Sequence, residues 1–483
     1  MKYKKYLSAF LILMFVSFLP SANSAQTNGL ASIEQLKQWA STLIDFGAGN
    51  PVFPYVRQAG TEADNRASQW FVEMFTSFGL KDVRREPVPL IGWKPSEWGL
   101  KAHSNDGEII LDSWPIFYAR FLDKGSITAP MVYVGSSPDD FPSDVSGKIV
   151  VADMLCPEII SFDGAKRTAF ETYDPDGTIK AGEKHRYWTF TNQKLYQLAA
   201  NSGAAAFIGI NRDKADNGRY YQNYGHVRPN PRNEEGDELG QLPGLYVSRM
   251  TGKVLRPLAQ KGLTATVISA GSNPMTQTYN IVGYLPGKSE KIIRVQSHSD
   301  GGAVNDASGA TAVLALAEYY SKLKSNKRTF QFVITGGHFT MGRGSTAFIK
   351  EHTFEIYSKD VVNFTIEHVG KHYDIVDGKL VDSGLPCPTF LFSTNKEWFP
   401  LLSEAVYKYD LKRTFIHPYS SPSHGEGASW HWRTRQPSIF AIAPVQYMQS
   451  SADTSEKIPF DRLRAITSVF MHLINKLDNT LDQ

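Results

Sequence analysis

The spacing of apolar residues along the chain predicts alternating helices and strands. Near the start it predicts two amphipathic helices, over residues 33–43 and 63–78, with apolar side chains three and four positions apart. From Asn280 onward, short apolar strands alternate with helices, and strands are expected at 292–295, 329–335, 361–366 and 438–443. This alternation is typical of an α/β fold, a mostly parallel mixed sheet with helices on both faces.

A stretch of different texture, from residue 127 to 268, separates these two parts. Short apolar strands such as 145–151 and 203–210 alternate there with turns, and two long polar segments, 161–188 and 213–240, interrupt them. Polar segments of this length are usually lids, binding loops or solvated loops. We therefore expect an inserted β-rich unit whose tyrosine-bearing segment 213–240 is either solvated or in contact with substrate.

The first residues are typical of an export signal. Lys2, Lys4 and Lys5 precede an apolar run, and small residues follow it up to Ala25. We expect this signal to be removed, with an uncleaved anchor as the alternative, and the protein to be periplasmic or secreted. The expected division is 1–25 signal peptide, 26–124 main domain, 125–272 inserted unit and 273–483 main domain again.

The net charge argues against nucleic acid as a partner. The whole chain has formal charge +3, and the predicted signal carries three lysines and no acidic residue, so the mature chain is near zero (+3 − 3). No later stretch is long and apolar enough to cross a bilayer, so no stable membrane insertion is expected. The oligomeric state is left open.

The two cysteines, Cys156 and Cys387, limit the kind of metal site that the chain could build. An exported protein permits a disulfide between them, but their spacing does not require one. Because two thiolates cannot form an all-cysteine zinc site, a metal would depend mainly on histidine and carboxylate ligands.

One short segment combines such ligands at the end of an expected strand. His298 and Asp300 follow the strand at 292–295, and Asp306 precedes an expected helix over 311–323. Ligands gather at the carboxyl ends of strands in open α/β sheets. His298 and Asp306 could hold a divalent metal there, with Asp300 orienting the imidazole. The alternative is a polar turn with an ordinary helix cap.

With these motifs the chain resembles the exported co-catalytic zinc aminopeptidases, the family of bacterial leucine and Streptomyces-type aminopeptidases and of glutamate carboxypeptidase. The inserted unit resembles a protease-associated domain, on the strings S-G-K-I-V-V at 146–151 and G-A-A-A at 203–206. The resemblance implies a metallopeptidase in which five protein ligands surround two zinc ions, with a peptide or small amide as substrate.

The chain departs from the family's ligand pattern at several positions. His298 and Glu367 match the first and fourth ligands, while the bridging aspartate position falls on Asn305, one residue before Asp306. The remaining positions are also changed: His338 stands in place of the glutamate base, Phe339 in place of the third ligand and Gln449 in place of the fifth.

We therefore expect a rearranged site with one zinc ion rather than two. Its ligands would be His298, Asp306 and Glu367, with His338 as fourth ligand or as general base, and Glu426 as a second candidate for the base. Two other histidines are near these residues in the sequence. His368 is expected to face away from the site, because neighbours on a strand alternate faces. His424 lies in a Gly/Ser-rich loop with Glu426.

Two functions fit these observations. The first is a hydrolase of peptide or amide bonds with aminopeptidase-like activity. The second is a non-catalytic peptide-binding protein that keeps the peptidase fold, and Asn305, Phe339 and Gln449 favour it. Glutaminyl cyclisation is not favoured, because the acidic residue that it would need is absent at Phe339.

Overall fold

The computed structural model of the chain describes residues 29–156, 160–185, 193–221, 239–304, 306–323, 326–419 and 425–480. The predicted signal peptide at 1–25 lies outside these described residues, as do Asn305 and His424.

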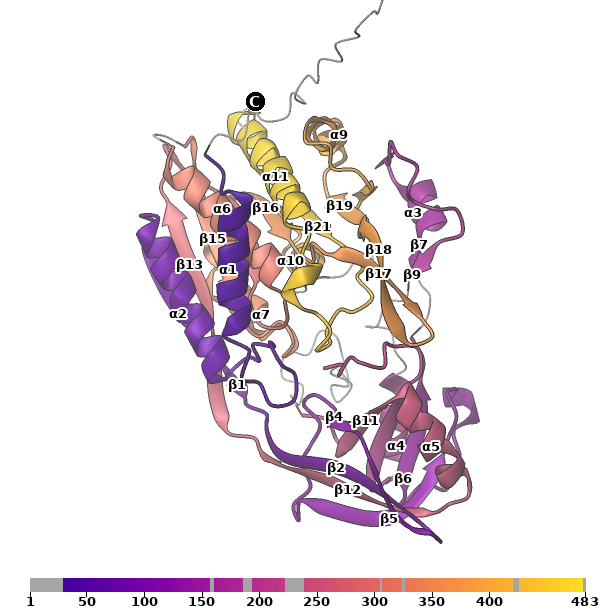
Figure 1. Cartoon of the computed structure of the whole chain (residues 1–483). Helices are drawn as coiled ribbons and strands as arrows, with labels where there is room; N and C mark the ends of the chain where they lie inside the picture. The colour runs from indigo at the N-terminus through magenta and orange to yellow at the C-terminus, as the bar shows by residue number, and fades with distance from the viewer. Residues whose placement is uncertain are drawn as a thin grey trace, which may run out of the picture.

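A nine-stranded sheet forms the larger part of the molecule (Figure 1). Its strands, in spatial order, are β1 (Lys81–Ile91), β13 (Met275–Leu285), β15 (Arg328–Thr335), β14 (Ser289–His298), β16 (Asp360–Ile366), β21 (Ser438–Ile442), β19 (Thr389–Ser393), β20 (Thr414–Pro418) and β8 (Glu171–Tyr173). The central strands β15, β14, β16 and β21 run parallel, whereas β1, β13 and β8 pair with their neighbours in the antiparallel sense. The sheet is thus mixed with a parallel centre, as predicted.

Helices cover both faces of this sheet, which confirms the predicted α/β fold. One face carries α1 (Ile33–Asp45), α2 (Glu62–Ser77), α6 (Ala307–Ser321), α9 (Phe399–Lys408) and α11 (Phe460–Thr480). The other carries α7 (Arg343–Glu351), α8 (Thr353–Lys359) and α10 (Glu426–Thr434). The hydroxyls of Ser32 and Thr61 cap α1 and α2, which therefore begin within a residue of their predicted starts.

Helix α6 lies in the middle of the first helical layer and carries the core. It contacts α1, α2 and α11 as well as β14 and β16, and nearly all of its side chains are buried. A helix that is buried on all sides must be apolar around its whole circumference, and 307–317 is made of small and aliphatic residues with Ser308 and Thr311. The first residues of α6 consequently reach the carboxyl ends of β14 and β16.

An eight-stranded second sheet forms the smaller part, and β1 and β13 lead into it (Figure 1). Its order is β3 (Gly107–Leu111), β2 (Lys94–Ser104), β12 (Thr264–Ser272), β5 (Ser126–Tyr133), β6 (Ile149–Met154), β10 (Ala206–Asn211), β11 (Gly244–Ser248) and β4 (Trp114–Pro115), accompanied by α4 (Gln193–Asn201) and α5 (Arg249–Gln260). Because β2, β3 and β4 belong to this sheet, the sheet begins earlier along the chain than residue 125.

The polar segment expected at 161–188 contains regular structure. Its described part holds β7 (Ile160–Ser161), α3 (Phe162–Thr168), β8 and β9 (Lys184–His185), and β8 extends the edge of the large sheet by pairing with β20. Beyond the sheets, β17 (Lys371–Val376) and β18 (Lys379–Pro386) form a hairpin, and short 3-10 helices occur at η2 (Pro138–Asp140), η4 (Lys396–Trp398) and η5 (Ser455–Lys457).

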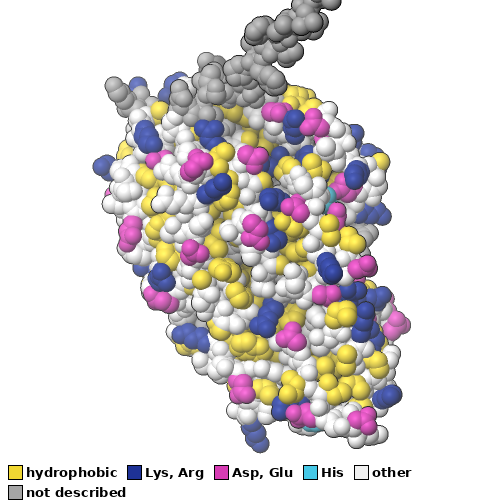
Figure 2. Space-filling model, viewed as in Figure 1, with side chains coloured by type: hydrophobic (Ala, Val, Ile, Leu, Met, Phe, Trp, Pro, Cys, Tyr) yellow, Lys and Arg dark blue, Asp and Glu magenta, His cyan; other side chains and the backbone are white. Residues whose placement is uncertain are grey.

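The charges on the surface are mixed, and the two cysteines lie inside the protein. Acidic and basic side chains alternate over the face shown in Figure 2, as the near-zero net charge suggests. Among the described residues no helix has the length and apolar character needed to cross a membrane. Cys156 and Cys387 are both buried, and no disulfide joins them.

Candidate metal centre

Three of the predicted ligands meet at the carboxyl edge of the large sheet. His298 is the last residue of β14, Asp306 precedes α6, and Glu367 follows β16. The His298 Nδ1 atom is 3.0 Å from Asp306 Oδ1, and its Nε2 atom is 3.4 Å from Glu367 Oε2. All three side chains are fully buried. Because β14 and β16 are adjacent parallel strands, their ends bring these residues together.

The Asp306 side chain turns into the site and makes no helix-capping hydrogen bond. Its Oδ2 accepts a hydrogen bond from the backbone N–H of Gly302 at 2.7 Å. Gly301 makes room for this carboxylate: its φ is 128°, and a Cβ there would overlap Asp306. The ordinary helix-cap alternative for Asp306 therefore does not describe this turn.

His368 belongs to this cluster, and the expectation that it faces away was wrong. One ligand atom each from His298, Asp306 and His368 lies within 4.8 Å of the other two, and His368 Nε2 is 3.9 Å from Glu367 Oε2. Face alternation fails because β16 ends at Ile366, and His368 adopts a left-handed backbone with φ 52°. Such a conformation is uncommon for a residue other than glycine and is often found at functional sites.

His338 stands beside the cluster and faces Glu426. Its ring stacks on His298 at 4.0 Å between centroids and 7° between planes, and its Nδ1 atom is 2.9 Å from Glu426 Oε1. Burial alone would raise the pKa of Glu426, but the hydrogen bond and charge of His338 lower it to about 2. Such an acid is a poor proton acceptor near neutral pH, and its carboxylate is placed to orient the His338 ring.

Asp300 holds a different group from the one predicted. Its two carboxylate oxygens accept hydrogen bonds from the backbone N–H groups of His338 at 2.9 Å and Phe339 at 3.1 Å. Both ring nitrogens of His298 face other carboxylates. Asp300 therefore fixes the position of the chain at His338 and not the imidazole of His298.

The buried carboxylates around His298 carry an excess of negative charge that a bound cation would balance. Five carboxylates are buried here, those of Asp300, Asp306, Glu367, Glu426 and Asp453, and the guanidinium of Arg57 faces three of them. Burial would lower the pKa of His298, but Asp306 and Glu367 raise it well above its usual value. An excess of buried negative charge is stable only if protons or metal ions balance it.

The donor atoms fit a metal ion. His298 Nδ1 and Nε2, His368 Nδ1 and Nε2, and Glu367 Oε2 are buried and make no hydrogen bond of good geometry with the described residues. Burial together with the charges of His298 and His338 lowers the pKa of His368 well below its usual value, so its imidazole is neutral, which is the form that binds metals. Two imidazoles and two carboxylates are ligands that zinc accepts.

Phe339 fills the place where the resemblance implies a ligand. Its ring meets the ring of Tyr221 edge to face at 5.5 Å and lies 4.9 Å from the ring of His338. Tyr221 comes from the inserted unit, and its backbone N–H donates to the carbonyl of Gln449 at 3.0 Å. An aromatic contact at Phe339 and a backbone contact at Gln449 are thus found at two positions where the resemblance implies metal ligands.

The described start of segment 213–240 lies against the candidate centre. Besides Tyr221, Tyr220 forms an isolated β-bridge with Ser450, and Arg219 exchanges hydrogen bonds with Ser451. The remainder of the segment, 222–238, lies outside the described residues.

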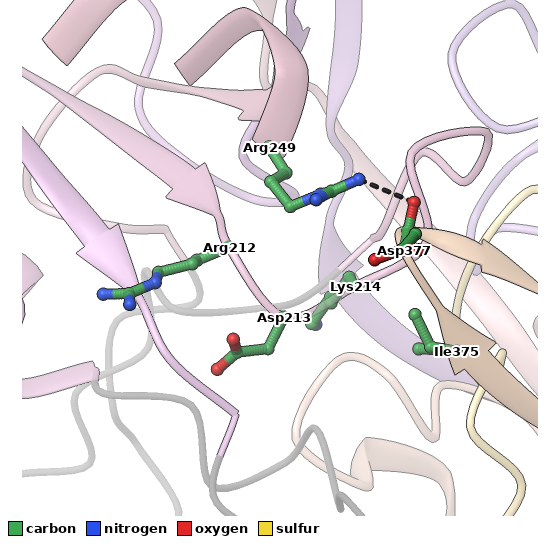
Figure 3. A pocket seen from close by; sticks show the side chains of 7 residues that line it. Arg212, Asp213, Lys214, Arg249, Ile375 and Asp377 are labelled. Carbon is green, nitrogen blue, oxygen red and sulfur yellow. Dashed lines mark hydrogen bonds between the residues drawn. The ribbon is translucent and has the colours of Figure 1, made fainter. Parts of the chain in front are cut away.

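A hollow of about 220 Å³ marks a second contact between the inserted unit and the main domain. Figure 3 shows Arg249 on its rim, reaching Asp377 in the turn of the β17–β18 hairpin; the Arg249 Nη2 atom donates to the Asp377 carbonyl at 2.7 Å. Lys214, which is 3% exposed, also lines this hollow. Burial lowers the pKa of Lys214 to about 7. The inserted unit therefore contacts both the candidate centre and this hairpin.

Residues 280–382 match the profile of Peptidase family M28. This stretch includes His298, Asp306, Glu367 and His368. No curated protein sequence that was compared matches the chain.

The family profile matches only part of the chain, but solved structures resemble it over nearly its whole length. A peptidase M28 precursor from Shewanella amazonensis SB2B is 17% identical, with a TM-score of 0.66, and the match covers 93% of this chain and 96% of the Shewanella protein. An aminopeptidase from Aneurinibacillus sp. strain AM-1 is 20% identical over 92% and 96%, with a TM-score of 0.59. BSAP, a zinc aminopeptidase from Bacillus subtilis, is 15% identical over 91% and 95%, with a TM-score of 0.61. At these identities the likeness establishes the aminopeptidase-like fold.

Arg57, which is far away in the sequence, supports the turn at residues 299–302 that follows His298. Its Nε donates to the Ser299 carbonyl at 2.7 Å and its Nη2 to the Gly302 carbonyl at 2.9 Å, while its backbone forms a β-bridge with Gly301. The side chain is fully buried. Sequence reasoning gave Arg57 no role, because nothing in the sequence around it points to a partner 242 positions away.

We expect Arg57→Gln to lower the free energy of unfolding by about 3–5 kcal/mol, because it removes the buried cation and leaves carboxylates and carbonyls without a partner. Zinc affinity should fall as the Ser299–Gly302 turn loosens. Denaturant unfolding of the metal-free protein measures the first effect. Arg84→Gln is a suitable control, since Arg84 is 41% exposed and its ion pair with Glu86 should contribute about 0–1 kcal/mol. Equal losses in the two variants would contradict a bracing role for Arg57.

Proposed function

We propose that the chain is an exported metal-dependent hydrolase of peptide or amide bonds, aminopeptidase-like in activity. Its substrate would be a peptide or small amide, and its site would hold one zinc ion through His298, Asp306, Glu367 and His368. The observation that carries this proposal is the meeting of these four buried side chains, whose ring nitrogens and Glu367 Oε2 make no good hydrogen bond with the described residues. His368 takes the ligand position that the sequence suggested for His338.

Zinc at this position would polarise the substrate carbonyl and lower the pKa of a water molecule. The protein's own contribution is to receive a proton at a fixed atom. Because His338 Nδ1 is directed at Glu426, its Nε2 keeps the lone pair. The His338 side chain is 23% exposed, so this nitrogen can reach a substrate, whereas His298 and Glu367 are buried. His338 then acts as general base, and Glu426 holds its tautomer.

One ion at this site is favoured over two. Phe339 contributes no donor atom, and its ring packs against Tyr221 of the inserted unit. A second ion sharing Asp306 would keep too few strong ligands to replace its hydration shell.

The inserted unit, which we propose to be a protease-associated domain, would restrict access to the site through the segment that carries Tyr221. We propose that the mature protein acts in the periplasm or outside the cell, on the strength of residues 1–25.

A direct test combines a zinc measurement with an amide-hydrolysis assay on the mature chain, purified without chelators. We expect zinc in the preparation and cleavage of aminoacyl p-nitroanilides that have a free amino group, lost on chelation and restored by zinc. N-acetylated versions of the same substrates should be cleaved much more slowly; equal rates would contradict the aminopeptidase assignment. A preparation with no zinc and no hydrolysis that still binds peptides by calorimetry would support the non-catalytic alternative, which Phe339 favours.

A further inference from the structure

A second group of donor atoms converges away from the residues of the candidate centre. Glu183 and His185 lie at β9 in the polar segment 161–188 of the inserted unit, called the inserted segment below. His372 is the second residue of β17 in the main domain. We propose that Glu183, His185 and His372 bind a further divalent metal ion of the zinc class, which ties the inserted segment to the main domain. This site shares no residue with the candidate catalytic centre.

The spacing of the three atoms is that of ligands around one ion. His185 Nε2 and His372 Nε2 are 3.0 Å apart, and Glu183 Oε1 is 3.4 Å from the first and 3.5 Å from the second. Ligands at tetrahedral angles around an ion 2.0–2.1 Å away lie roughly 3.3 Å from one another. The Oδ1 atom of Asp374, a half-exposed side chain, is 3.4 Å from His372 Nε2 and is placed to bind directly or through water.

The hydrogen bonds around His185 leave its inner nitrogen available. Its Nδ1 is 3.2 Å from the Pro444 carbonyl, which can only accept, so the proton sits on Nδ1 and Nε2 keeps its lone pair. The ring also packs against Phe162 at 4.5 Å between centroids. A carbonyl partner on the outer nitrogen is the usual way in which a protein orients a histidine ligand.

Glu183 points to a cation independently of the histidines. Its Oε2 accepts a hydrogen bond from the Lys180 backbone at 3.2 Å, but its Oε1 is buried and accepts none from the described residues. The imidazole nitrogens of His185 and His372 lie 3.4 and 3.5 Å from this oxygen. Burial and the neighbouring His185 lower the pKa of His372, so its imidazole is neutral. Because this buried oxygen accepts no hydrogen bond from the described residues, it lacks a counter-charge that a metal ion would supply.

A proton is the competing occupant. Arg413 Nη2 is 3.4 Å from His372 Nδ1, and since a guanidinium only donates, the metal-free form carries its proton on Nε2, directed at His185 Nε2. Metal binding moves this proton to Nδ1 and ends the Arg413 contact. That contact is at the long limit for a hydrogen bond, and Arg413 keeps a shorter bond to the Thr178 carbonyl at 2.7 Å.

The expected consequence is mechanical. The ion would join two segments that are 187 positions apart in the chain, and such a link restricts the unfolded chain strongly. The same hairpin meets the inserted unit again at Asp377 and Arg249. Metal binding should therefore stabilise the protein and fix the inserted segment against the β17–β18 hairpin.

The test uses full-length mature protein carrying His298→Ala, which disables the catalytic centre. The protein is stripped with chelator and titrated with Co²⁺, and bound metal, visible absorption and melting temperature are measured. We expect one equivalent of Co²⁺ with the bands of a tetrahedral ion and a higher melting temperature. Adding His372→Gln should abolish all three responses, and adding Glu183→Gln should weaken binding at least tenfold.

The control adds His352→Gln instead. The His352 Nε2 and Nδ1 atoms face different carboxylates, Glu86 at 3.0 Å and Glu355 at 3.5 Å, so they do not share a centre. This variant should bind Co²⁺ as the His298→Ala protein does. Binding that survives both His372→Gln and Glu183→Gln, or no binding by the His298→Ala protein, would overturn the proposal. Since the readout is metal binding without catalysis, its failure is distinct from a failure of the proposed hydrolase function.

Discussion

Replacing His298 by alanine is expected to remove the catalytic metal and to lower amide hydrolysis on the order of a thousandfold or more, equivalent to about 4 kcal/mol of lost transition-state stabilisation. His298 is the residue whose two nitrogens face both Asp306 and Glu367, at 3.0 and 3.4 Å. Without its imidazole, those carboxylates lose the group that separates their charges. The metal-free variant should nevertheless fold, because His298 is the last residue of β14 and its ring contacts are with the other site residues His338, Phe339 and His368.

Zinc content and kcat/KM, measured on the same preparations, check this prediction. His417→Ala is a matched control: His417 is another buried histidine near the end of a strand, β20, and burial lowers its pKa to about 4. It should keep both catalytic zinc and activity. Measurements should be made with His372→Gln present in all proteins, so that an ion at the further site does not mask the loss. Retained hydrolysis in His298→Ala would show that the metal cluster is not the catalytic centre.

Local pattern was sufficient for the elements that make up the α/β layers. Helices α1 and α2 have strong helical periodicity and hydroxyl caps, so both were predicted to within two residues at each end. The strands β15, β16 and β21 are short apolar runs in a buried sheet and were also found. β14 was predicted too short, because the polar residues at its two ends, 289–291 and 296–298, look like loop in the sequence, although Gln296, Ser297 and His298 are buried.

Contacts between distant segments decided the rest. Arg294 is accommodated inside the protein by Gln331 and Asp360, which no local pattern reveals. The strand β8 is three residues long and forms only because β20 offers it an open edge. The orientation of His368 depends on a left-handed backbone just after a strand, and the role of Asp300 depends on two backbone N–H groups 38 and 39 positions away.

The same limit applies to the candidate site. Residues at strand ends can be found from sequence, because a polar residue after a buried strand is a local signal, and His298, Asp306 and Glu367 were found in this way. Whether His338 or His368 completes the cluster depends on side-chain direction. Sequence counting placed His338 at the family's base position, and we propose that role and not a ligand role, because His338 Nδ1 faces Glu426.

Replacing His338 by alanine is therefore expected to separate metal binding from catalysis. Zinc content should stay unchanged, because His338 lies outside the group of His298, Asp306 and His368. kcat should fall by about 10²–10⁴-fold, the usual contribution of a general base, with little change in KM. Glu426→Gln should cause a smaller loss, about ten- to a hundredfold, because it leaves the imidazole in place but removes the charge that orients it.

A pH profile tells a general base from a residue that only packs on His298, whose ring it meets at 4.0 Å. Loss of the base should flatten the acidic limb of kcat against pH, and added imidazole should restore part of the activity of His338→Ala. A merely structural role would lower kcat at every pH alike and would not respond to imidazole. Loss of zinc from His338→Ala would instead make His338 a ligand and return the site to the arrangement that the sequence alone suggested.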